Sequence, residues 1–139
     1  MKMKRYFMNS SLLYTVLAMV FGVFYREFTK FNSFMAPTKL SFIHPHYFVL
    51  GMVFFFFLLI MEKQFSFSTE KTKKILVAYH VGLNIAVAGF LARGIMQVWD
   101  IVPSKALDAS LSGIAGIGHV LLGVSMILIF LQIRKSIAE

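Results

Sequence analysis

The sequence has no cysteine, three prolines and only six acidic residues among its 139 positions. The absence of cysteine excludes disulfides, thiolate metal sites and cysteine nucleophiles. The six carboxylates lie in predicted loops, turns or the C-terminus, and neither a G-x-S-x-G motif nor a phosphate-binding loop occurs, so we predict no catalytic residue. Charged residues make up 14% of the chain, against about 25% in an average soluble domain. The composition therefore argues against an ordinary soluble domain.

Apolar residues, in contrast, make up 58% of the sequence and gather in four long runs. These runs cover approximately residues 9–25, 45–61, 75–98 and 111–133. Because a helix of about 20 apolar residues crosses the hydrocarbon core of a bilayer, each run is long enough to span it. The sequence therefore predicts a single all-α domain over residues 1–139, an integral membrane four-helix bundle whose first partner is the lipid bilayer.

The basic residues indicate how the chain is oriented. The formal net charge is +8, but Lys and Arg stand in short clusters beside the apolar runs, so no nucleic acid partner is predicted. Nine basic residues fall on one side of the four spans: Lys2, Lys4, Arg5, Lys63, Lys71, Lys73, Lys74, Arg134 and Lys135. Four fall on the other side, namely Arg26, Lys30, Lys39 and Lys105. Since cytoplasmic loops are enriched in Lys and Arg, both termini are predicted to be cytoplasmic.

Polar side chains within or at the rim of the spans are costly in lipid, usually face a bundle interior and often mark function. They are His44, His46, His80, Asn84, Arg93, Gln97 and His119. His80 and Asn84 are four residues apart and share one face of the third helix, while Arg93 and Gln97 form a second such pair on a different face. Each pair predicts an interhelical polar contact, or alternatively part of a polar path.

His119 lies in a strip of small residues on the fourth span. At about 100° per residue, Ser112, Gly116 and Gly123 fall within about 60° of its direction. The strip predicts room beside the imidazole for a flat ligand or for a closely packed helix. The alternative is that these glycines, with Gly113, serve ordinary helix packing and that His119 hydrogen-bonds across the interface.

His44 and His46 flank Pro45, which suits the first position of a helix because its missing N–H would have no partner there. His46 is predicted to point inward, whereas His44 is better placed as a cap or loop residue. Tyr47, beside them, is a ring type that favours the membrane interface. The alternative is that both histidines are simply interfacial polar residues.

Haem b is the ligand that this pattern favours, because bundle cofactor sites are built from facing helices and imidazole is a common axial ligand of haem iron. His46 lies at the outer rim, and His119 lies about 12 Å into the fourth helix, so a tilted haem between them is our first hypothesis. Arg93 and Arg26 stand at the same end and are predicted to bind the haem propionates.

Two other pairings remain open at this point, with His80 or His44 as the axial ligand. His80 lies deeper, like His119, but no cationic partner for propionates is evident near it. Zinc is less favoured, because no compact histidine and carboxylate pattern such as H-E-x-x-H occurs.

Several segments together resemble a bacterial family of small four-helix membrane proteins of unknown function. They are Val23–Phe28, His44–His46 with Leu50 and Gly51, Ala92–Gly94 with Gln97 and Val98, and Ser112–His119. The resemblance covers nearly the whole chain. It implies the fold and the bacterial cytoplasmic membrane as location, and it implies no activity.

A more local resemblance, over about the first two helices, is to the haem-copper oxidase catalytic subunit. In that family a histidine near the outer end of the second helix ligates a low-spin haem, and His46 followed by an apolar helix is similar. This chain is far shorter and lacks the family's several metal-ligating histidines. The resemblance therefore implies at most a haem ligand, and neither oxygen reduction nor proton pumping.

Three functions follow as hypotheses. The first is a haem b protein that transfers electrons to a redox partner or senses a diatomic gas or haem itself. The second is a cofactor-free accessory or assembly subunit of a larger membrane complex. The third is a transporter or channel component, for which four helices would usually need to form a homo-oligomer.

Overall fold

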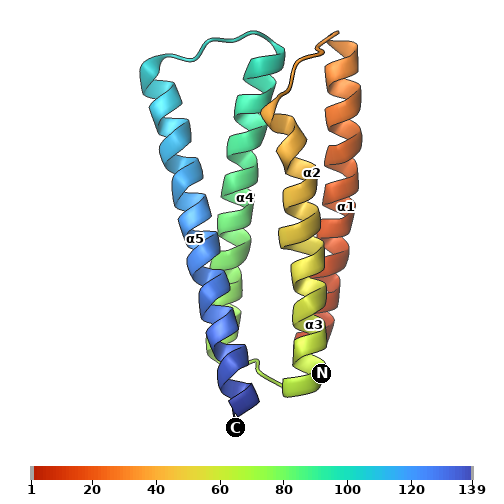
Figure 1. Cartoon of the computed structure of the whole chain (residues 1–139), viewed down its shortest axis with the longest axis vertical. Helices are drawn as coiled ribbons and strands as arrows, with labels where there is room; N and C mark the ends of the chain where they lie inside the picture. Colours follow the sequence, from red (N-terminus) through yellow and green to blue (C-terminus); the bar gives the residue numbers. More distant parts are fainter. Residues whose placement is uncertain (1, 139) are drawn as a thin grey trace.

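The computed structural model describes residues 2–138, and within that range the chain is helical with no strand (Figure 1). Four helical columns run side by side: α1 (Lys2–Phe31), a second column over Lys39–Phe65, α4 (Glu70–Val98) and α5 (Lys105–Ala138). Each is long and apolar enough to cross a membrane, which confirms the predicted all-helical chain with four candidate membrane spans. Both termini lie at one end, called here the terminal end, and the opposite end is called the distal end (Figure 1).

The helices extend past the predicted spans, because an apolar run locates only the part of a helix that suits lipid. Thr69, for example, caps α4 at Glu70: its backbone N–H donates to Thr72 Oγ1 at 2.8 Å, and its own hydroxyl accepts from Thr72 N–H at 3.4 Å. At the distal end, α1 continues to Phe31, so the connection to the second column is only residues 32–38. The predicted membrane boundaries themselves stay predictions.

The second column is not a uniform α-helix. It begins as a 3₁₀ turn, η1 (Lys39–Phe42), passes through α2 (Ile43–Pro45) and η2 (His46–Val53), and ends as α3 (Phe54–Phe65). The segment η2 is a π-helix, in which the N–H of Phe54 reaches back to the carbonyl of Val49. His46, therefore, is the first residue of the widened segment. The sequence predicts a regular α-helix here, because eight residues are too few for the spacing of apolar side chains to distinguish a π-helix from an α-helix.

Hydroxyl groups from two neighbouring helices bind the carbonyls of η2. Ser11 of α1 donates to Met52 O at 3.0 Å, and Tyr79 of α4 donates to Leu50 O at 2.7 Å. A carbonyl away from water needs a donor, so these bonds stabilise the widened segment. Gly51 permits the close approach of α1, because a Cβ at this position would lie 2.5 Å from Tyr14 Cβ.

An aromatic core joins α1, α3 and α4. Tyr14 stacks on Phe55 with ring centroids 5.7 Å apart, and Phe54 stacks on Tyr79 at 4.5 Å. The fully buried side chains of this core include Phe7, Tyr14, Phe55, Leu58, Leu76, Tyr79 and Leu83. Most remaining large side chains on the outside are apolar, as expected for helices that face lipid.

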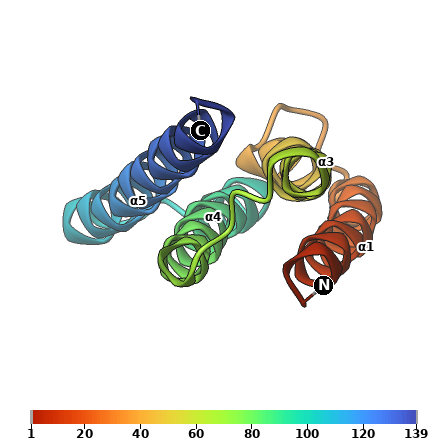
Figure 2. The same ribbon diagram turned by 90° about the horizontal axis from the view of Figure 1, so that it is seen from below.

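Helix α5 packs mainly along α4 and stands at one outer side of the molecule, with α1 at the other (Figure 2). Towards the terminal end α5 also reaches α3, where the ring centroid of Phe130 lies 5.9 Å from that of Phe57 and 6.4 Å from that of Phe54. Towards the distal end α5 diverges from the second column (Figure 1). Because of this divergence, the distal half of α5 does not pack along the second column. It faces the beginning of η2 beside α4.

Candidate functional site

His46 and His119 face each other where α5 diverges from η2. Their ring centroids are 6.3 Å apart and the ring planes are nearly perpendicular, at 87°. Phe90 of α4 lies against both rings, 4.7 Å from His46 and 5.8 Å from His119. Three helical columns therefore meet at these side chains. His46 and His119 are 73 positions apart in the sequence, and the structure brings this predicted pair together.

Both imidazoles are oriented by the same kind of backbone hydrogen bond. His46 Nδ1 lies 2.8 Å from Phe42 O, and His119 Nδ1 lies 2.7 Å from Ala115 O. A carbonyl oxygen can only accept, so Nδ1 is the protonated nitrogen in each ring. In the neutral imidazole the lone pair is then on Nε2, which has no hydrogen-bond partner among residues 2–138. This is the arrangement by which proteins prepare a histidine to ligate a metal through Nε2.

The glycines of α5 divide into two groups around His119. Gly118 packs against α4, because a Cβ on it would come 2.9 Å from Ala86 N. A Cβ added at Gly113, Gly116 or Gly123 would meet no atom within 4 Å. Among residues 2–138, then, the close helix contact next to His119 is made through Gly118, and Gly116 and Gly123, which flank His119, make none.

Arg93 connects α4 to the first turns of α5. Its guanidinium Nη2 lies 2.8 Å from Asp108 Oδ1 and also donates to Ser112 Oγ at 2.5 Å. Ser112 precedes His119 by seven residues, about two helical turns on the same face. Arg93 therefore stands on the distal side of the histidine pair, with its charge balanced by Asp108.

Arg26 lies elsewhere. It belongs to α1, its side chain is 80% exposed, and its ion pair is with the adjacent Glu27 at 3.6 Å. Helix α1 lies on the far side of the second column from α5 (Figure 2). Within residues 2–138, therefore, Arg26 is not brought together with His46, His119 and Arg93.

His44 packs on α1, away from α5. It lies within α2 and not in a loop, and its Nδ1 donates to Ala18 O at 2.8 Å. Its ring rests against Gly22, where an added Cβ would come 3.1 Å from His44 Nδ1. The two-residue separation between His44 and His46 thus sends their imidazoles to different neighbouring helices.

His80 belongs to a separate polar cluster between α1, η2 and α4. Tyr6 Oη lies 2.8 Å from His80 Nε2, and Tyr14 Oη lies 2.6 Å from His80 Nδ1. Asn84 continues the cluster, donating to Tyr14 Oη at 3.3 Å and accepting from Tyr47 Oη at 2.9 Å. Since hydroxyls occupy both ring nitrogens, His80 offers no lone pair to a metal in this arrangement. Tyr47 is 5% exposed and lies inside the molecule, although its ring type suggested the interface.

The sequence reasoning identified His80 and Asn84 but missed their tyrosine partners. A signal was available, because Tyr14 falls in the middle of an apolar run, where its hydroxyl needs a hydrogen-bond partner. Phe90 could not be distinguished from the other 15 phenylalanines of the 16 in the chain.

The remaining polar side chain, Gln97, points to a third location. Its Oε1 accepts from the backbone N–H of Lys39 at 2.7 Å, and the neighbouring Gly94 carbonyl accepts from Thr38 Oγ1 at 3.1 Å. These bonds fasten η1 to the distal end of α4. The polar residues predicted to form one path therefore belong to three separate clusters.

The chain has four candidate membrane spans with hydrogen-bonded polar clusters between them, a combination that is typical of multi-pass α-helical membrane proteins. The chain belongs to the family described as "Protein of unknown function (DUF2871)", whose match covers residues 3–136. No curated protein and no solved structure matches this chain.

Proposed function

We propose that this protein binds haem b between His46 and His119 and uses it for electron transfer or for sensing a diatomic gas or haem. The proposal rests above all on one observation, the two facing imidazoles that each donate Nδ1–H to a backbone carbonyl. Both Nε2 lone pairs are then available to a metal on the side away from those carbonyls.

The spacing of the pair supports a shared metal ion. Metal–imidazole bonds are about 2.0 Å long, so two imidazoles on opposite sides of one ion have ring centroids roughly 6 Å apart. The separation of the two ring centroids is 6.3 Å. For both nitrogens to reach one haem iron, the imidazoles would have to turn their Nε2 atoms towards each other, and the Phe90 ring, which lies against both, would have to move aside for the porphyrin.

The number of protein ligands favours haem over zinc. Within residues 2–138 no group of three or more His, Cys, Asp or Glu side chains is arranged to hold a metal ion. Structural and catalytic zinc sites take three or four protein ligands, whereas haem iron carries its own four equatorial nitrogens. Two imidazoles are a complete protein contribution to a six-coordinate haem.

The surroundings of the pair suit a flat, partly apolar ligand with carboxylate groups. The strip at Gly116 and Gly123 offers room along α5 beside His119, and Phe90 supplies an apolar side chain from α4. Arg93, on the distal side, could bind a propionate by exchanging or sharing its present partner Asp108. Arg26, which pairs with Glu27 on α1, is not included among the residues proposed to bind a propionate.

Haem supplies a one-electron iron couple when it is bound. A haem held by both His46 and His119 would suit electron transfer, whereas gas sensing would require one of the two imidazoles to be released. His119 is the better candidate for release, because α5 packs mainly on α4 and stands at one outer side of the molecule (Figure 2).

Orientation and location complete the proposal. The nine basic residues counted at the terminal end favour both termini in the cytoplasm, and the family resemblance favours a multi-pass protein of the bacterial cytoplasmic membrane. The haem would then lie in the outer half of the membrane. A redox partner would be reached from that side, and a homo-oligomer or a larger membrane complex is compatible with the exposed face of α5.

The test is the visible absorbance spectrum of the protein purified in mild detergent from haem-replete cells, oxidised and then reduced. We expect near-stoichiometric haem with sharp reduced bands, and loss of those bands in His46→Ala and in His119→Ala. His44→Ala is the matched control, because it removes an imidazole two residues away that packs on α1. A wild-type protein that stays colourless after haem is added, or equal haem loss in all three variants, would refute the proposal.

A second candidate function, a cofactor-free accessory or assembly subunit, is favoured by the same open strip. A Cβ added at Gly113, Gly116 or Gly123 would meet no atom of the described residues within 4 Å, and strips of small residues often receive a partner helix in membranes. Co-purification of one membrane protein in fixed ratio, lost in Gly116→Leu, from a colourless preparation would favour this function.

A further inference from the structure

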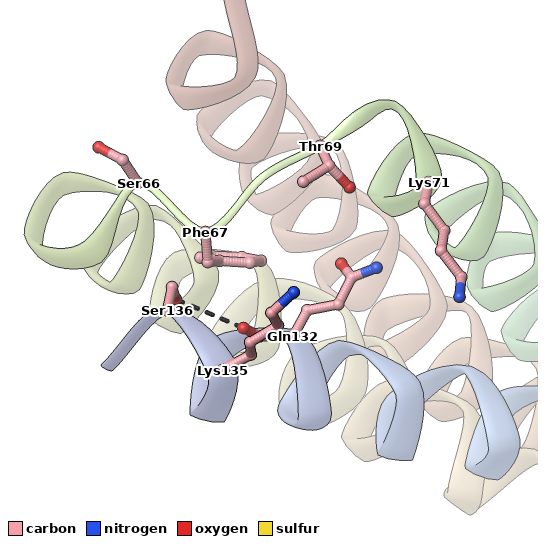
Figure 3. Close-up of a pocket in the computed structure, with 7 residues that line it drawn as sticks. All are labelled: Ser66, Phe67, Thr69, Lys71, Gln132, Lys135 and Ser136. Carbon is pink, nitrogen blue, oxygen red and sulfur yellow. Dashed lines mark hydrogen bonds between the residues drawn. The ribbon is translucent and has the colours of Figure 1, made fainter. Parts of the chain in front are cut away.

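A polar pocket lies at the terminal end, apart from the histidine pair. It has a volume of about 350 Å³ and opens between the α3–α4 connection, the first turn of α4 and the last turns of α5 (Figure 3). Its lining residues are Ser66, Phe67, Thr69, Lys71, Gln132, Lys135 and Ser136. Two of them are lysines, and among the described residues that line it none is acidic. The charge of the lining therefore favours an anion.

A directional chain of hydrogen bonds orients the Gln132 amide. The backbone N–H of Thr69 donates to Thr72 Oγ1 at 2.8 Å, so the hydroxyl proton of Thr72 is available for Gln132 Oε1, which lies 2.6 Å away. The carbonyl end of the amide is thus occupied by Thr72. Its NH₂ end remains as a donor at the pocket, where it adds to the positive charge of the lysines in the lining.

Helix α4 adds its N-terminal end to the pocket. The first N–H groups of a helix have no carbonyl partner within it, and the helix dipole makes this end positive. Lys71 and Glu70 both stand in this first turn, and Glu70 forms an ion pair with Lys73, so Lys71 adds its positive charge to that of the dipole. Phe67, 3% exposed and stacked on Phe7 at 6.0 Å, forms a rigid apolar wall beside the donors.

We propose that this pocket binds the phosphate of an anionic phospholipid headgroup. Two lysines, an amide donor and a helix N-terminus match phosphate oxygens, and the apolar wall suits the glycerol region of a lipid. The pocket lies where the apolar helices end, at the level of lipid headgroups, and basic pockets between helices are typical headgroup sites. Inorganic phosphate shares the chemistry and is the alternative source of the anion. The proposal does not depend on haem.

Native mass spectrometry of the full chain in a neutral detergent tests this proposal. The protein is titrated with phosphatidylglycerol or with phosphatidylcholine, and in a second arm with inorganic phosphate against bound phosphatidylglycerol. We expect one phosphatidylglycerol to bind preferentially and to resist millimolar phosphate. Displacement by inorganic phosphate at those concentrations would support the same site with the free anion as its ligand.

The variants decide whether the pocket is responsible. Lys71→Gln with Lys135→Gln should weaken phosphatidylglycerol binding tenfold or more, because each lysine at an anionic surface contributes roughly a fivefold change. Lys63→Gln with Lys74→Gln removes the same charge at the same end, outside the pocket lining. This control should change binding by less than about threefold, which is half the tenfold effect on a logarithmic scale. Gln132→Leu, which keeps both lysines, provides a second test if the first double variant folds poorly. Equal binding of the two lipids, or equal loss in both double variants, overturns the proposal.

Discussion

Gly82 of α4 and Gly118 of α5 lie against each other so closely that neither could carry a side chain without movement. A Cβ on Gly82 would come 2.9 Å from Gly118 O, and a Cβ on Gly118 would come 3.1 Å from Gly82 O. Small residues let two helix backbones approach in this way in membrane proteins. This contact sets the position of α5, and His119 is the residue next to it.

Gly82→Ala is therefore expected to destabilise the protein. Its Cβ would also lie 2.6 Å from Leu122 N, a backbone atom that can yield only by moving α5. We expect the free energy of unfolding to fall by about 1 to 3 kcal/mol, as for other overpacked sites. Unfolding in mixed detergent micelles, followed by far-ultraviolet circular dichroism, measures it.

Gly113→Ala is the matched control on the exposed side of α5. Its Cβ would meet nothing within 4 Å, and alanine favours a helix over glycine by about 1 kcal/mol. The variant should be as stable as the parent or slightly more stable. Equal destabilisation by both substitutions would contradict the close packing of α4 on α5.

Arg93 and Asp108 should affect haem binding in opposite directions. If Arg93 binds a propionate, Arg93→Gln should weaken haem affinity about five- to thirtyfold by removing a charge-assisted hydrogen bond. Asp108→Asn removes the competing carboxylate and should leave affinity equal or higher. Because the side chains are 31% and 52% exposed, loss of the pair should lower stability by less than about 1 kcal/mol. Haem titration followed at the Soret band measures both variants, and weaker binding in both would argue against the propionate contact.

Tyr14→Phe tests the polar cluster around His80. The change removes the partner of His80 Nδ1 and of the Asn84 amide, while the ring stays packed on Phe55. Since it leaves polar groups unpaired between helices, it should lower the free energy of unfolding by about 1 to 2 kcal/mol. Tyr25→Phe, outside the cluster on the same helix, should have no measurable effect in the same unfolding experiment. Similar effects of the two changes would mean that the cluster does not stabilise the fold.

The absence of cysteine makes the orientation directly testable. Ser104→Cys lies at the distal end and Gln64→Cys at the terminal end, and both positions are exposed. With the termini in the cytoplasm, a membrane-impermeant maleimide should label Ser104→Cys in intact cells and Gln64→Cys only after permeabilisation. The reverse pattern would place the proposed haem site in the inner half of the membrane. Labelling of both variants in intact cells would argue that the chain does not span the membrane as proposed.

The sequence alone determined the helical class, the number of long apolar helices and the candidate histidine pair. These features depend on local composition: run length indicates a span, and a polar residue inside a run must have a partner. His46 and His119 could be selected because each stands in such a run, with small neighbours or a helix start beside it. The family resemblance also follows from the sequence, and the family match over residues 3–136 confirms it.

Tertiary structure alone decided which polar groups meet. His80 remained open as an alternative partner of His119 because both lie deeper in the bundle, but rotation of α4 turns His80 towards two tyrosines of α1. Arg26 and Arg93 were placed together because they share one end, yet Arg26 is exposed and pairs with Glu27, whereas Arg93 turns towards Asp108 and Ser112 of α5. Hydropathy measures depth along a helix and contains no information on its rotation or neighbours. Those are set by close contacts such as Gly82 with Gly118, which form only when segments distant in sequence pack together.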